Sequence, residues 1–160
     1  MANNKVVSIE NAKIAFRNFA GVAKKFNPEG SRNFCVFLDP HIALALINER
    51  WNIRFLNPRD PADDRQAYVQ VKVQFDNFPP NVVMITSGGK QQLNVNTVAA
   101  LDYAEIVRTD LILRPYAWNV NGKSGTKPYL KAMYVTIAED DFGGRYKDLP
   151  DSDAPEYDAD

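Results

Sequence analysis

The stretch "IVRTDLILRPYAWNVNGKSGTKPYLKAMYVTIAED", residues 106–140, decides the fold class. Its apolar and β-branched residues recur with strand spacing on both sides of "NGKSG", which contains two glycines. Two such runs around a glycine-rich turn predict an antiparallel β-hairpin with a long, mobile, cationic turn. Since alternate residues of a strand share a face, Arg114, Tyr116 and Trp118 are expected to point to one side.

The returning strand is expected to place Tyr129 and Lys131 on one face, followed by Met133, with Lys123 and Lys127 in or beside the turn. Rings next to cations suit single-stranded nucleic acid, because stacking of a base on an aromatic ring contributes about 1–3 kcal/mol whatever the sequence. Lysines and arginines beside the rings neutralise phosphates and release counterions. A duplex hides the faces of its bases, so such a surface favours single strands.

A second decisive stretch is "AYVQVKVQFD", residues 67–76, which alternates between two faces. Its apolar face carries three valines and Phe75, and its polar face carries Tyr68, Gln70 and Lys72. This pattern predicts a half-buried antiparallel strand. It also makes Tyr68 and Lys72 further candidates for the wall of a DNA-binding groove. The same stacking and phosphate contacts would serve there.

The rest of the chain predicts strands near 5–16, 33–39, 52–56 and 82–87. A helix is expected from Pro40 to about residue 51, because Asp39 can cap it and proline is tolerated in its first turn. A short helix is expected after Thr97. About six strands and two helices without a βαβ rhythm predict a mainly β fold: a small antiparallel barrel of the oligonucleotide-binding (OB) type. The length of 160 residues suits one such domain, expected over residues 1–142.

Charge divides the chain into two parts. Residues 1–138 hold seventeen Lys and Arg against eleven Asp and Glu, a balance of +6, whereas residues 139–160 have a balance of −7. A cationic body with an anionic end indicates a polyanionic partner. We expect residues 143–160 to be a disordered acidic tail, which solubilises the protein, mimics phosphates in the groove or recruits other proteins. The single Cys35 and the absence of a basic-then-apolar N-terminal stretch predict a cytoplasmic protein.

Longer patterns resemble a known family. "FRNFAG", "FNPEGSRNFCVFLD", "NVVMITSGGKQQLNVNTVAALDYAEI" and "RPYAWNVNGKSGTKPYLKAMYVTI" are similar to single-stranded DNA-binding proteins of tailed bacteriophages, which have OB folds. The resemblance implies a protein without cofactor that coats exposed strands during replication and recombination in an infected bacterium. It also implies that the acidic tail engages replication or repair proteins. Such tails often end in a large hydrophobic residue, whereas this chain ends in "YDAD", and this difference leaves the partner role open.

Other functional classes have weaker support. His41 is the only histidine and stands in the first turn of a predicted helix, so a Ser-His-Asp device or the usual zinc site lacks partners. A metal-dependent nuclease needs converging carboxylates, and Asp60, Asp63 and Asp64 cluster only in a proline-containing loop. The nuclease therefore remains a weak alternative, and no catalytic or metal-binding residue is predicted. A virion or assembly protein without a nucleic-acid role is the second alternative.

Overall fold

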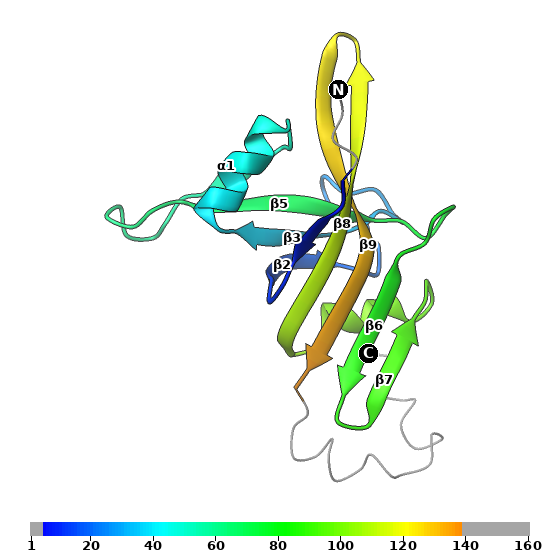
Figure 1. The fold of residues 1–160 in the computed structure, drawn as a ribbon. Coiled ribbons are helices and arrows are strands. Elements are labelled where there is room, and N and C mark those ends of the chain that lie inside the picture. Colours follow the sequence, from blue (N-terminus) through cyan, green and yellow to red (C-terminus); the bar gives the residue numbers. More distant parts are fainter. Residues whose placement is uncertain (1–4, 139–160) are drawn as a thin grey trace.

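The computed structural model describes residues 5–138, which form one long twisted sheet system with a single α-helix (Figure 1). In chain order the elements are β1 (Val7–Ile9), β2 (Lys13–Asn18), β3 (Arg32–Leu38), α1 (Pro40–Asn48), β4 (Arg54–Leu56), β5 (Gln66–Val73), β6 (Asn81–Thr86), β7 (Gly89–Leu93), the 3₁₀-helix η1 (Val98–Asp102), β8 (Ile106–Val120) and β9 (Lys123–Ile137). The predicted domain boundary at residue 142 and the predicted tail 143–160 lie outside the described residues. None of the helices in the described part is long and apolar enough to cross a membrane.

The sheet runs in the order β1-β8-β9-β5-β3-β2, with β4 paired to β5, and the β6–β7 hairpin paired to β9. Most pairs are antiparallel, as expected, but β9 pairs in parallel with β5 and with β6. The predicted mainly β fold of OB type is confirmed, although the ladder is mixed and does not close into a complete barrel. Strand β7 was not anticipated, and the expected strand at 5–16 divides into β1 and β2.

The spine of the fold is the hairpin of β8 and β9, each 15 residues long. Only Asn121 and Gly122 separate the strands, and both have positive φ, 54° and 81°. Positive φ at both central residues suits a two-residue hairpin turn, for which Asn-Gly is the preferred sequence. The expected long turn "NGKSG" is therefore wrong, because Lys123, Ser124 and Gly125 already belong to β9.

The core lies under the half of the hairpin that is distant from this turn. Leu111 and Leu113 of β8 and Met133 and Val135 of β9 are fully buried there. The valines of β5 complete the core, as the alternation of residues 67–76 predicted. By contrast, residues 116–124 are exposed, and Figure 1 shows this end of the hairpin standing clear of the sheet. One hairpin therefore supplies both the core and a projecting arm.

A β-bulge lies within the buried half of this hairpin. Ile112 pairs with Ala132 but Leu113 pairs with Leu130, so Lys131 is the extra residue. A bulge interrupts the simple alternation of faces. Met133 was expected on the face of Tyr129, and it is instead buried in the core. Lys131 itself is exposed.

Candidate nucleic-acid interface

The projecting arm carries rings and cations on one face. Its cross-strand pairs on that face are Arg114 with Tyr129, Tyr116 with Lys127, and Trp118 with Gly125. Directly opposed residues in antiparallel strands have their side chains on the same side, so the predicted common face of Arg114, Tyr116 and Trp118 agrees with the register.

Each ring on this face has a defined position. The rings of Tyr116 and Tyr129 meet edge to face with centroids 6.1 Å apart. Trp118 lies flat over Gly125, where an added Cβ would come within 2.7 Å of the indole. Glycine is thus needed at this position so that the indole can approach the neighbouring strand. Tyr116 and Trp118 remain 58% and 37% exposed, so part of each ring is accessible to a ligand.

Cations lie over the same rings. The guanidinium of Arg114 stands 5.9 Å from the ring centre of Tyr129 and 5.5 Å from that of Phe78. Phe78 belongs to the loop between β5 and β6, so Arg114 connects this loop to the arm. The Nζ of Lys127 lies 6.0 Å from the centre of Tyr129 on the arm itself. These distances are within the range of cation–π attraction.

The segment after α1 fixes the arm from the side. Thr126 donates hydrogen bonds from its backbone N to the carbonyl of Arg50 (2.9 Å) and from its Oγ1 to the carbonyl of Glu49 (2.7 Å). Arg50, with a φ of 67°, also donates from Nη1 to Ser124 Oγ over 3.0 Å. Trp51 is buried and forms an isolated bridge with Thr126. The segment after α1 is therefore attached to the arm by these contacts.

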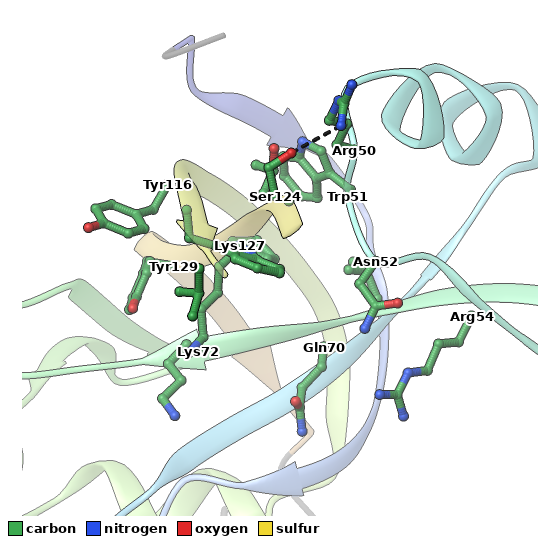
Figure 2. A pocket seen from close by; sticks show the side chains of 16 residues that line it. Arg50, Trp51, Asn52, Arg54, Gln70, Lys72, Tyr116, Ser124, Lys127 and Tyr129 are labelled. Carbon is green, nitrogen blue, oxygen red and sulfur yellow. Dashed lines mark hydrogen bonds between the residues drawn. The ribbon is translucent and has the colours of Figure 1, made fainter. Parts of the chain in front are cut away.

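Between the arm, this segment and β5 lies an open cleft of about 780 Å³. Figure 2 shows the side chains that converge on it. Four are aromatic and four are cationic: Tyr116, Trp118, Tyr129 and Trp51, and Arg50, Arg54, Lys72 and Lys127. No aspartate or glutamate is among the described residues that line it. An excess of positive charge without carboxylates produces a field that attracts a polyanion.

Two lysines of the cleft influence each other. Lys72 is partly buried on β5, next to Tyr129 across the parallel pairing of β5 with β9, and its Nζ donates to Ser31 Oγ over 3.2 Å. Burial lowers the pKa of Lys72 below its usual value, and the positive charge of Lys127 lowers it further. An anion between these two lysines would relieve this repulsion.

The cleft contains five of the nine residues predicted from the sequence, namely Lys72, Tyr116, Trp118, Lys127 and Tyr129. The other four lie outside its lining. The guanidinium of Arg114 lies 5.9 Å from the ring centre of Tyr129, Lys123 adjoins the tip of the arm, and Lys131 occupies the bulge. Tyr68 lies on the same polar face of β5 as Lys72, in ring contact with Phe16 at 6.2 Å.

Several lining residues were missed. Arg50 and Trp51 were expected at the end of the predicted helix. No local feature of the sequence indicates the hydrogen bond between Arg50 and Ser124, 74 residues further on. Arg54 precedes the only phenylalanine of a three-residue strand, too short for a reliable face assignment. The position of Gln70 in the cleft could have been predicted from the sequence, because Gln70 shares the polar face of residues 67–76 with Lys72.

Among the described residues, no cluster of His, Cys, Asp and Glu has the geometry to hold a metal ion. The comparisons with known proteins point to the predicted class of nucleic-acid-binding protein.

The family model described as "Putative phage ssDNA-binding domain" matches residues 2–160. The chain belongs to this family of phage single-stranded DNA-binding proteins. This membership confirms the predicted class, in which the protein binds single-stranded DNA and is not an enzyme.

Solved structures show a similar fold. The single-stranded DNA-binding protein from bacteriophage Enc34 is 13% identical, with 93% of this chain and 89% of that chain covered and a TM-score of 0.54. Its complex with ssDNA is 11% identical, covering 86% and 89%, with a TM-score of 0.54. Its C-terminal truncation is 11% identical, covering 84% and 87%, with a TM-score of 0.55. No curated protein matches the chain.

Proposed function

We propose that single-stranded DNA binds in the cleft between the arm and β5, with little preference for sequence. The observation that carries this proposal is the lining of the cleft, which combines accessible rings and four cations without a carboxylate among the described residues. Bases need flat apolar faces, phosphates need positive charge, and a carboxylate would repel the backbone. The cleft meets all three requirements.

The roles divide by chemistry. Tyr116, Trp118 and Tyr129 supply stacking faces, of which Trp118 is the largest and Tyr116 the most exposed. Lys72 and Lys127 neutralise phosphate, because their mutual repulsion is relieved by an anion between them. Arg50 and Arg54 add phosphate contacts at the other side of the cleft. None of these roles involves a hydrogen bond to the edge of a base, and stacking on aromatic rings tolerates any base sequence.

The remaining predicted residues act at the margin. Arg114 lies between the rings of Phe78 and Tyr129, where it orients Tyr129 and offers charge to a passing phosphate. Lys123 and Lys131 are exposed on β9, at the tip of the arm and at the bulge. They contribute charge along the approach to the cleft.

Membership of a phage family supports a role in coating strands exposed during DNA replication and recombination, in the cytoplasm of the infected bacterium. For the acidic residues 143–160 we infer contact with other proteins or competition with DNA for the cleft. A chain ending at residue 142 tests the competition. Tighter DNA binding than the full chain, most of all at low salt, supports it, and equal affinity at every salt concentration refutes it.

The cleft proposal is tested by fluorescence titration of the full chain with oligo(dT), oligo(U) and a duplex, each at two salt concentrations. Stacking on Trp118 quenches its emission, whereas buried Trp51 responds less. The matched variant Trp118→Phe keeps a ring for stacking but loses the reporter. Quenching by oligo(dT) that disappears in Trp118→Phe, with affinity largely kept, supports the cleft. Tight binding without any change in Trp118 emission places the DNA elsewhere.

A further inference from the structure

Phe16 has an unusual backbone. Its φ is 51°, in the left-handed region, at the irregularity where the pairing of β2 with β3 shifts between Ala15 and Asn18. Such a φ is an outlier for a bulky residue, because its Cβ crowds the backbone. Burial does not offset this strain, since the side chain is 61% exposed. The sequence therefore maintains an exposed ring in a strained conformation, and strain of this kind concentrates at functional sites.

The residues after Phe16 hold it in place. Arg17 donates from Nη1 to the carbonyls of Leu101 (2.7 Å) and Ala104 (2.8 Å). The carboxylate of Asp102 accepts from the backbone N of Phe19 (2.6 Å) and of Ala20 (3.0 Å). These four bonds attach the segment to η1 and its C-terminal loop. A firmly attached segment can keep one residue in a costly conformation.

The ring of Phe16 lies at the end of the surface that leads out of the cleft. It meets the ring of Tyr68 with centroids 6.2 Å apart, inclined by 56°. Tyr68 pairs directly with Arg54, which lines the cleft, so these two side chains share a face. Figure 2 shows Arg54, Gln70 and Lys72 extending on the same side of β5. The polar face of β5 thus joins the cleft to the Phe16–Tyr68 pair without a break.

We propose that Phe16 and Tyr68 form a second stacking station for the same DNA strand, an inference that rests on the proposed function of the cleft. The strand leaves Lys72, passes Gln70 with a phosphate near Arg54, and places a base on the Phe16–Tyr68 rings. From Lys72 to Tyr68 is four residues of β-strand, about 13 Å at about 3.3 Å per residue. The station therefore serves only oligonucleotides long enough to extend beyond the cleft.

The test is a length series of oligo(dT), from about 4 to about 16 nucleotides, the range of sites found on single OB folds. The variant is Phe16→Gly, because glycine accepts the left-handed φ and removes the ring without adding strain. The shortest oligonucleotides should bind Phe16→Gly as they bind the unaltered chain. The longest should bind about 5- to 150-fold more weakly, the loss expected for one stacked base. Thermal unfolding should show that Phe16→Gly is at least as stable.

Two further variants separate this station from the cleft. Trp118→Ala should weaken short and long oligonucleotides alike, and Tyr103→Ala, which removes an exposed ring beside η1, should affect neither. If Trp118→Ala weakens binding but Phe16→Gly binds every length normally, the second station is refuted and the cleft stands. Equal weakening at all lengths by Phe16→Gly also refutes a separate station. If Trp118→Ala has no effect at any length, the cleft proposal itself fails.

Discussion

The two halves of the β8–β9 hairpin are built from continuous strands but perform different tasks. Near the bulge and beyond it, Leu111, Leu113 and Met133 are fully buried. Past Pro115, the same two strands expose every residue from Tyr116 to Ser124. The first half holds the sheet together, and the second half presents rings and cations beside the cleft.

If DNA binds in the cleft as proposed, stability and DNA binding are separable within one element. Residues of the exposed half contribute little buried area, so their loss should affect the ligand more than the fold. Leu111, Leu113, Met133 and Val135 of the buried half do not line the cleft, so their loss should affect the fold first. Variants matched between the buried and the exposed half can break or sharpen this division.

The largest effect is expected for Leu113→Ala in the buried half. Removing a fully buried leucine side chain loses transfer free energy and leaves a cavity, together about 2–5 kcal/mol of unfolding free energy. Denaturant titration followed by circular dichroism measures this loss. Below the unfolding transition, the variant should still bind oligo(dT) with nearly unchanged affinity. A loss under about 1 kcal/mol would show that this half is not the centre of the core.

Trp118→Ala in the exposed half should have the opposite profile. The lost stacking should weaken oligo(dT) binding by about 1–3 kcal/mol while the dependence on salt stays nearly unchanged. Unfolding free energy should fall less than in Leu113→Ala, because Trp118 is 37% exposed. Fluorescence anisotropy of a labelled oligonucleotide measures the affinity, with Tyr103→Ala as the aromatic control. If Trp118→Ala unfolds, the indole belongs to the core, and the exposed half of the hairpin is not separable from the stability of the fold.

Lys127→Ala should change the salt dependence instead. Each phosphate contact on a single strand contributes about 0.7 to the slope of log affinity against log salt concentration. Losing Lys127 should reduce the slope by about that amount, so the deficit is largest at low salt. The control is Lys90→Ala on β7, an exposed lysine outside the cleft. Equal slopes for Lys127→Ala and Lys90→Ala would show that Lys127 contacts no phosphate of the bound strand.

The alternation of residues allowed much of this architecture to be predicted. Residues 67–76 assigned Tyr68, Gln70 and Lys72 to one face of β5, and the register agrees. The hairpin was also anticipated, but its turn was not. A Gly-rich run cannot show locally that Gly125 lies in a strand under Trp118 instead of in a loop. The bulge at Lys131 had no local signal either, and it redirected Met133 into the core.

The cleft could be predicted only in part, because its second wall comes from another region of the chain. The aromatic face of the arm followed from spacing within one strand. The contacts of Arg50 and Trp51 with Ser124 and Thr126 depend on how α1 packs, which no periodicity encodes. Phe16, with its positive φ, likewise lies in a segment that Arg17 and Asp102 attach to η1 over a long distance in the sequence. Sequence patterns reveal faces, whereas sites between faces depend on tertiary packing.

The smallest expected effect is a dependence of binding on alkaline pH, which sharpens the role of Lys72. In the free protein, burial and the charge of Lys127 hold the pKa of Lys72 below its usual value. A bound phosphate favours the charged form and raises this pKa, so DNA binding takes up a proton in the intervening range. Affinity should therefore be greatest below the lowered pKa and should decline as pH rises through it. Lys72→Arg, which stays charged over this range, should give a flatter profile at constant salt. Identical profiles for both proteins would mean that no phosphate approaches Lys72, and β5 would then be a scaffold for the arm without contact to DNA.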